Sequence, residues 1–259
     1  MRFLRPLAVL LGGLVILTAA WLALGGAATA APSRPAPTTA AITHTVTLTP
    51  LRDNTLYESS TGTLSNGAGR YLFAGTTARG AQARRGLLAF DLGAIPPGAT
   101  ILSATLTLNM SRTIAGESAV ALHALTADWG EGASAAGGEE GGGAPPAPGD
   151  ATWIHTFFDT ATWAQPGGDF APTPSAVTMV SVPGAYSWAS PALLADIVAW
   201  LADPAANSGW ALLGDESAGG TAKRFDSREN DPANRPRLAI TYTVEGEPPH
   251  EAFVPVVAR

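Results

Sequence analysis

The chain has 259 residues, no cysteine and a formal net charge of −6. The absence of cysteine excludes disulfides, thiolate metal sites and cysteine catalysis. A hydrophobic content of 46% over this length allows one domain with a sizeable apolar core, with or without tails.

Residues 1–30 are predicted to be a secretory signal peptide. Arg2 and Arg5 precede an apolar run, and Ala28 and Ala30 then form an A-x-A cleavage site. Because the apolar run is about as long as a membrane-spanning helix, an uncleaved anchor is the alternative. Either reading exports the rest of the chain. Cleavage removes two of the 15 basic residues and none of the 21 acidic ones, and the resulting charge of −8 disfavours nucleic acid as a partner.

Residues 31–42 are rich in proline, alanine and threonine and read as a linker. The next part, 43–244, shows short apolar or alternating runs between turn residues, which is the pattern of strands. In the run 99–110, Leu102, Ala104, Leu106 and Leu108 are expected to share one face. The predicted strands cover 44–50, 69–75, 84–92, 99–110, 119–125, 176–182, 209–214, 222–227 and 236–244.

One segment breaks this β pattern. Ser190 and Pro191 form a helix start, and apolar residues then recur at helical spacing, so an amphipathic helix is predicted over about 190–202. Residues 130–150 consist mostly of Gly, Ala, Glu and Pro and are expected to form a mobile insertion without a core. Residues 245–259 read as a C-terminal tail. These features predict a single all-β domain, a sandwich or jelly roll with one short helix.

Several stretches, taken in chain order, carry a family resemblance. They are "DNTLYES" (53–59), "RRGLLAFDLGAIPPGATILSATLTL" (84–108), "DWGEG" with "ATW" and "TATWAQPGGDF" (128–170), and "NSGWALLG" with "FDSRE" and "RPRLAITY" (207–242). This order resembles the DNRLRE domain, a family also described as disaggregatase-related. That family is similar to a carbohydrate-binding module family whose characterised members bind alginate. The resemblance covers 43–244 and implies a jelly-roll β-sandwich that acts as a non-catalytic, surface-displayed module.

Two motifs bear on catalysis and metal binding. A hydrolase elbow needs glycine two residues before the nucleophile, but Asp215 precedes Ser217 at that distance, so "GDESAGG" reads as a hairpin loop. An EF-hand beginning at Asp226 needs Gly and Glu where Asp231 and Arg237 stand. A looser oxygen site for structural calcium stays open by analogy with jelly-roll carbohydrate modules, and the metal ligands are unknown from the sequence.

The basic residues suggest how an acidic polysaccharide could bind. Guanidinium groups grip carboxylates in a bidentate manner, and indole faces stack on sugar rings. If the strands 84–92 and 222–227 are neighbours, their basic residues form a strip on an otherwise acidic protein. The alternative is that the basic side chains are solvated or paired internally and that Trp163 anchors a loop. The candidate ligand-binding residues are Arg79, Arg84, Arg85, Lys223, Arg224 and Trp163.

The stretch "AKRFDSREN" (222–230) also contains polar residues that follow Arg224, and these are given a structural role instead of a ligand-binding one. Asp226, Arg228 and Glu229 are expected to form a structural polar turn before the last strand. The sequence thus predicts an exported, non-catalytic and monomeric carbohydrate-binding module, with an anionic polysaccharide such as a polyuronate as partner. A structural or adhesive surface domain without a sugar ligand is the first alternative, and a stand-alone polysaccharide-cleaving enzyme is the second. A membrane is expected as a partner only through an uncleaved N-terminal segment.

Overall fold

The computed structural model describes residues 41–245. The predicted signal peptide, most of the predicted linker and nearly all of the tail lie outside this range. No helix within it is long and apolar enough to cross a membrane. The strands are β1 (Ala41–Leu48), β2 (Arg52–Tyr57), β3 (Tyr71–Thr76), β4 (Ala83–Ala89), β5 (Thr100–Thr113), β6 (Ser118–Ala124), β7 (His155–Phe157), β8 (Ala161–Thr162), β9 (Ala176–Val180), β10 (Gly184–Trp188), β11 (Trp210–Leu213), β12 (Lys223–Asp226) and β13 (Arg237–Glu245).

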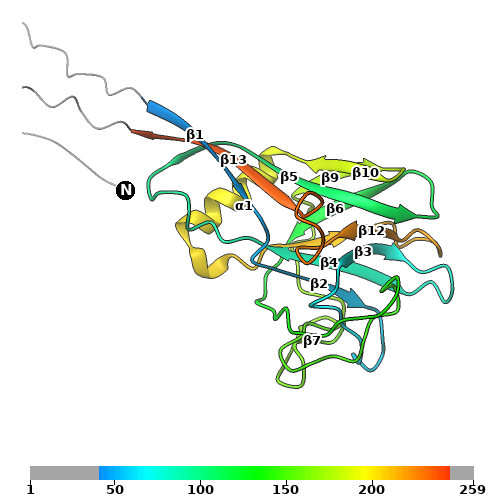
Figure 1. Ribbon diagram of the computed structural model, residues 1–259. Coiled ribbons are helices and arrows are strands. Elements are labelled where there is room, and N and C mark those ends of the chain that lie inside the picture. Colours follow the sequence, from blue (N-terminus) through cyan, green and yellow to red (C-terminus); the bar gives the residue numbers. More distant parts are fainter. Residues whose placement is uncertain (1–40, 246–259) are drawn as a thin grey trace, which may run out of the picture. The chain divides into compact units, whose positions relative to one another are not determined.

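Eleven of these strands form one large antiparallel sheet that curls into a half-barrel (Figure 1). Its main path runs β1-β13-β5-β12-β3-β4-β11-β6-β9, while β10 pairs with β5 and β2 pairs with β4. Strands β3 and β4 are joined through only two residue pairs, Gly75 with Arg84 and Thr76 with Ala83. The mostly β composition is therefore confirmed, with one continuous curled sheet in place of two separate ones. Strands β7 and β8 make a second, small sheet.

The main core lies between the two halves of the curled sheet. Leu106 and Leu108 of β5 and Leu238 of β13 meet Leu88 of β4 and Trp210 of β11 in one buried cluster. Burying such aliphatic and aromatic side chains supplies about 1.5–3 kcal/mol each, which makes this cluster the main source of stability. A second cluster around Leu56, Trp129 and Trp163 joins the loops after β6 to the outer face of β2 and β4. Figure 1 shows these loops, with β7, beneath β2 and β4.

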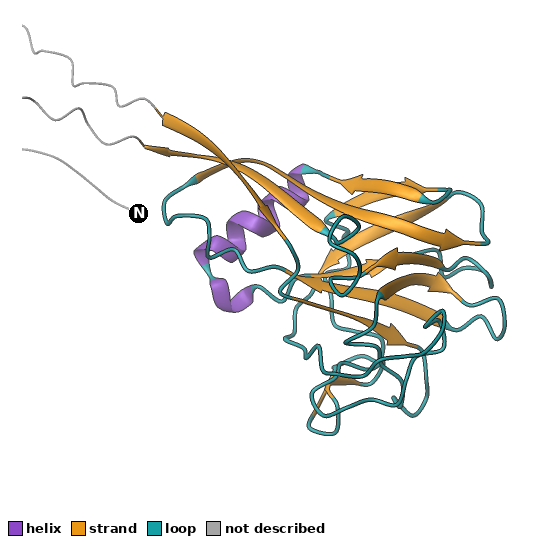
Figure 2. Cartoon of the chain, in the orientation of Figure 1, coloured by secondary structure: helices purple, strands orange, loops and turns teal. Residues whose placement is uncertain are grey.

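The helix α1 (Pro191–Ala202) forms as predicted. The Ser190 side chain accepts a hydrogen bond from the Leu193 backbone N–H, and Pro191 occupies the first turn. Leu193, Ile197 and Trp200 are its buried residues and all three belong to the main core. The helix packs against β5, and a short 3₁₀ turn, η1 (Pro204–Ala206), follows it (Figure 2).

The predicted face of β5 is wrong at one residue. Ala104, Leu106 and Leu108 are buried, but the Leu102 side chain is 51% exposed. The pairing of β5 with β13 shifts register between Thr241 and Tyr242, so that Thr241 pairs with Ser103 and Tyr242 with Ile101. This irregularity skips Leu102 and leaves its side chain facing outward. Alternation within β5 does not reveal this extra residue, because it becomes apparent only in the pairing with β13.

Candidate functional site

The expected basic strip does not form. Strand β3 separates β12 from β4, so the two strands that carry the basic residues are not neighbours. Lys223 is fully buried, and its Nζ donates a hydrogen bond to the Gly116 carbonyl at 2.8 Å. Arg84 is 3% exposed and stacks over the Tyr57 ring at 4.8 Å. Burial lowers the pKa of Lys223 and of Arg84, although Tyr57 acts to raise the latter. Neither side chain is available to a polysaccharide, so these two assignments are wrong.

Arg85 lies on a different part of the surface. Its guanidinium forms two hydrogen bonds with the Glu216 carboxylate, at 2.7 and 2.8 Å, and lies 4.8 Å from the Trp153 ring centre. Its contacts are therefore with the loops on the outer face of β4 and β11, whereas Arg224 contacts Ser111, Tyr71 and Glu139. Arg85 and Arg224 share none of these neighbours, so the structure does not bring the two together.

Arg79 and Trp163 are the other two predicted ligand contacts, and they lie in different environments. Arg79 is exposed in the hairpin between β3 and β4, and no ion pair involves it among residues 41–245. Trp163 is 4% exposed, and its Nε1 donates to the Thr152 carbonyl at 2.8 Å. An indole buried in this way cannot stack on a sugar, so the assignment of Trp163 as a ligand contact is wrong. It anchors the loops instead.

Arg224 meets a residue that the sequence did not single out. Arg112 of β5 pairs with Arg224 of β12, so both guanidinium groups lie on the same outer face of the sheet. The two groups converge on the same carboxylate oxygen, Oε2 of Glu139, which lies 2.7 Å from Nη1 of Arg112. We call Arg112 and Arg224 together the arginine seat. The Arg112 side chain is 57% exposed and that of Arg224 13% exposed.

The surroundings of the arginine seat hold its two cations in place. Arg224 lies 3.7 Å from the Tyr71 ring centre, and its Nε donates to Ser111 Oγ at 3.1 Å. A shallow hollow of about 170 Å³ adjoins the seat, with Phe73 at its floor and Ile114 at its edge. Ile114 is 78% exposed, so an apolar surface stands beside the two charges. Such a mixture suits a ring that carries both C–H edges and a carboxylate.

The Gly-rich segment 130–150 supplies Glu139 and is packed against the sheet. Its Glu140 is 7% exposed, and the Oε2 atom accepts hydrogen bonds from Asn66 Nδ2 at 2.9 Å and from the Tyr71 N–H at 3.0 Å. Asp150 is fully buried and accepts from the Ala147 N–H at 2.6 Å. The composition predicts a mobile insertion here, whereas the structure has a segment that is packed and hydrogen-bonded. Charge-assisted hydrogen bonds fix a segment whose composition alone predicts no order.

The polar turn after β12 makes only internal contacts among the described residues. Asp226 accepts hydrogen bonds from Asn109 Nδ2 at 2.5 Å and from Asn230 Nδ2 at 3.0 Å. The backbone N–H of Arg228 donates to Asp53 Oδ2 at 2.7 Å. These bonds tie the turn to β5 and β2, as a structural role for the turn requires.

Three carboxylates gather beside this turn. Asp53, Glu131 and Glu229 each offer an oxygen within 4.8 Å of the others. Burial raises the pKa of all three groups, and the negative charge of Glu229 adds to the effect on Asp53. Arg228 lies 3.3 Å from Glu131 and 3.0 Å from Glu229, and the positive charge of Arg52 also acts on Glu131. Oxygen clusters of this kind suit calcium in their chemistry. The sequence pointed to the turn, but Asp53 and Glu131 are distant in the chain and were missed.

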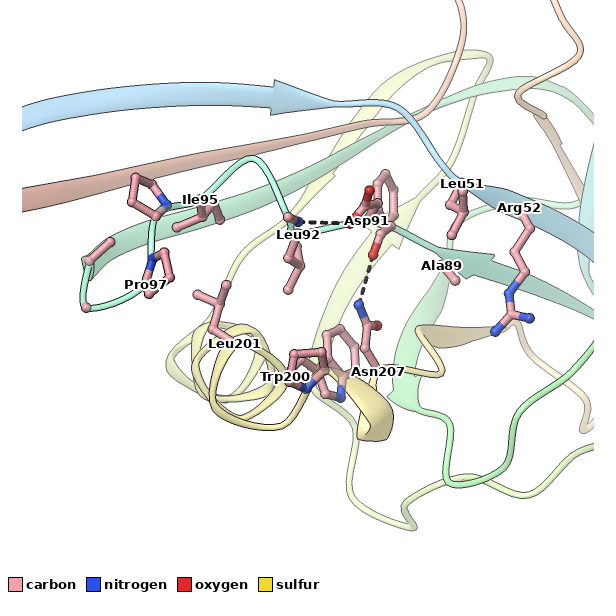
Figure 3. A pocket seen from close by; sticks show the side chains of 16 residues that line it. Leu51, Arg52, Ala89, Asp91, Leu92, Ile95, Pro97, Trp200, Leu201 and Asn207 are labelled. Carbon is pink, nitrogen blue, oxygen red and sulfur yellow. Dashed lines mark hydrogen bonds between the residues drawn. The ribbon is translucent and has the colours of Figure 1, made fainter.

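A more enclosed hollow of the described domain lies elsewhere, between the end of α1 and the loop after β4. It measures about 450 Å³, and apolar side chains such as Ile95, Pro97 and Leu201 line much of it (Figure 3). Asn207 closes one side by donating from Nδ2 to the Phe90 carbonyl at 2.9 Å. None of the residues predicted to bind ligand contributes to this hollow.

Comparison with known proteins returned no match to a protein-family model and no match to a curated protein. The resemblance to the DNRLRE domain consequently remains an expectation from the motifs. Any assignment of function must be argued from the geometry described above.

Proposed function

We propose that this protein is an exported, monomeric and non-catalytic module that binds an acidic polysaccharide, such as a polyuronate, at the arginine seat. The jelly-roll type of the β fold is part of this proposal, as is display outside the cell. The proposal takes its ligand class from the sequence resemblance. The pairing of Arg112 and Arg224 with Glu139 supports the proposed location, which differs from the expected strip.

The observation that carries the proposal is the convergence of two guanidinium groups on one carboxylate oxygen. Arg112 and Arg224 come from neighbouring strands, and Glu139 is the acid that both contact. Guanidinium groups bind carboxylates strongly and with defined orientation because their planar N–H donors match the carboxylate oxygens. Tyr71 and Ser111 hold Arg224 in position. A uronate carboxylate fits the chemistry of the same pair.

The shape of the surface favours a polymer over a free small molecule. The hollow of about 170 Å³ beside the seat is below the size of usual small-molecule pockets, about 300–1,000 Å³. One seat then contacts one sugar residue weakly, and a polymer compensates because it presents the same carboxylate many times. We therefore expect weak binding of monomers and clear binding of long chains.

Affinity electrophoresis tests the proposal directly. The protein is run through gels that contain alginate, pectin or a neutral glucan, at low and at moderate salt. We expect retardation by the two anionic polymers only, with the retardation reduced as salt screens the charges. Retardation by none of the three would contradict the proposal and would favour a structural or adhesive domain. Release of reducing ends from any of these polymers would favour a polysaccharide-cleaving enzyme.

Structural calcium is a second proposal, which the acidic group of Asp53, Glu131 and Glu229 supports. A buried oxygen of Glu229, Oε2, has no hydrogen-bond partner, and Arg228 forms the ion pairs with this group while Arg52 pairs with Asp128. A divalent cation would balance this charge and occupy the free oxygen. Isothermal titration of chelator-treated protein with calcium should show binding at one site, and an Asp53→Asn variant should lose it. Absence of heat with folded wild-type protein would exclude the site.

A further inference from the structure

Glu139 occupies the position in the arginine seat where a ligand carboxylate would be expected. Its Oε2 atom contacts both Arg112 and Arg224. Its side chain is nevertheless 66% exposed, and burial contributes little to its environment. Hydrogen bonding and the positive charge of Arg112 hold the pKa of Glu139 below its usual range, so the internal carboxylate is ionised at neutral pH. Within residues 41–245, the seat is thus filled by an acid of the chain itself.

The backbone around Glu139 is held by its neighbours, while the Glu139 side chain is exposed. Gly138 has a φ of +66° and Glu140 a φ of +61°, so left-handed conformations flank Glu139 on both sides. The Glu140 side chain bonds to Asn66 and to the Tyr71 N–H, and its carbonyl accepts from Tyr57 Oη at 2.9 Å. The neighbouring residue is therefore fixed. An exposed side chain changes rotamer within nanoseconds, so Glu139 can leave the seat without movement of the segment.

We propose that Glu139 is an internal substitute for the ligand carboxylate and that it sets the specificity of the arginine seat. Only a ligand that brings an anionic group, such as the ionised carboxylate of a uronate residue, can replace it. A neutral sugar that displaced Glu139 would leave two guanidinium groups without their acid, at a cost in free energy. This inference rests on the proposed function, because it concerns the same site.

The size of the effect follows from the strength of the ion pair. A tethered competitor multiplies the apparent affinity of a ligand by the fraction of time that it leaves the site free. Exposed ion pairs are weak, so removal of the Glu139 charge should raise the affinity for a polyuronate about two- to sixfold. The gain for a neutral glucan should be absent.

The experiment compares wild-type protein with a Glu139→Gln variant. Alginate oligosaccharides and an uncharged glucan oligosaccharide are titrated by calorimetry at constant salt. A Glu245→Gln variant is the matched control, because it removes the same charge at an exposed position on β13. Thr243 pairs with Thr100 at the other end of β5 from Arg112, a separation of about 40 Å along the strand. Glu245→Gln therefore reports the effect of net charge alone.

The possible results separate the two proposals. The inference predicts a two- to sixfold gain for Glu139→Gln on alginate, little change for Glu245→Gln, and no gain on the uncharged glucan. Equal affinities of wild type and Glu139→Gln would overturn the inference and leave the proposed function standing. Binding by neither protein, with both folded, would overturn the proposed function together with the inference. An equal gain in the two variants would assign the effect to net charge and would also overturn the inference.

Discussion

Lys223 and Arg224 are adjacent in β12 and carry the same charge, yet they have opposite environments. Lys223 is fully buried and bonds to the Gly116 carbonyl, whereas Arg224 turns to the outer face and meets Arg112 and Glu139. Successive side chains of a strand point to opposite faces, so adjacent basic residues cannot share one surface there. Arg84 and Arg85 of β4 show the same division, since Arg84 packs on Tyr57 and Arg85 on Trp153. Two adjacent basic residues in a strand are therefore expected to have different roles, because one lies on each face of the sheet.

The largest expected effect on stability comes from Lys223, the buried residue of the Lys223–Arg224 pair. Lys223→Ala deletes a long buried stem, and we expect the free energy of unfolding to fall by about 2–4 kcal/mol. Lys223→Met keeps most of the volume without the charge and should cost less than about 1.5 kcal/mol. Urea unfolding measures both. A Lys223→Ala variant that keeps wild-type stability but loses polysaccharide binding would reverse the division of roles between Lys223 and Arg224.

A second prediction concerns the segment that carries Glu139. Glu140→Ala removes the acceptor for Asn66 and for the Tyr71 N–H, and we expect a loss of stability of about 1.5–3 kcal/mol, as for other charged hydrogen bonds. Glu139→Ala, one residue away, should change stability by less than about 1 kcal/mol because its ion pairs are exposed. Thermal unfolding of the two variants gives the comparison. Equal losses would show that Glu139 is as structural as its neighbour.

The third prediction concerns affinity. Arg112→Gln removes one of the two guanidinium groups of the arginine seat, and binding to alginate should weaken about tenfold. Arg237→Gln is the matched control, because Arg237 is exposed on β13 and pairs opposite Thr107, away from the seat. Arg79→Gln tests the remaining exposed residue of the sequence prediction and should have little effect. A larger loss for Arg79→Gln than for Arg112→Gln would move the binding surface to the β3–β4 hairpin.

The smallest effect is expected in the pH dependence of stability without calcium. Burial raises the pKa of Asp53, Glu131 and Glu229 in the folded protein. The folded state then binds more protons than the unfolded state between the ordinary carboxyl range and the raised values, so stability falls as pH rises through that window. We expect a fall on the order of 1 kcal/mol in chelator-treated protein, which added calcium should reduce. Stability that instead rises with pH across this range would contradict the assignment.

The sequence predicted those parts of the fold that depend on local signals. Ser190 and Pro191 mark the start of α1 because capping acts within one turn, and alternation reveals most strands. Strands β2, β7, β8 and β10 were missed, and the exposure of Leu102 was wrong because it depends on a register shift with β13. The order of Gly-rich residues 130–150 was also missed. That order comes from contacts of Glu140 with Asn66 and Tyr71, which composition does not encode.

The candidate site was predicted less well than the fold. Arg224 was named correctly as a basic residue on a strand, but its partner Arg112 lies far away in the chain and joins it only through the pairing of β12 with β5. The acidic group of Asp53, Glu131 and Glu229 was likewise only partly predicted from the sequence. Glu229 belongs to the turn that the sequence marked as polar, while Asp53 and Glu131 reach it from β2 and from a loop. Sites built across strand partners require the register, and one sequence does not supply it.

The location of binding is the central claim, and NMR mapping tests it most directly. Isotope-labelled protein is titrated with alginate oligosaccharides, and the backbone amide shifts are followed. The account predicts the largest shifts at Arg112, Thr113, Ile114 and Glu139, around the arginine seat. Shifts centred instead on Arg85, or no shifts at saturating oligosaccharide, would contradict it.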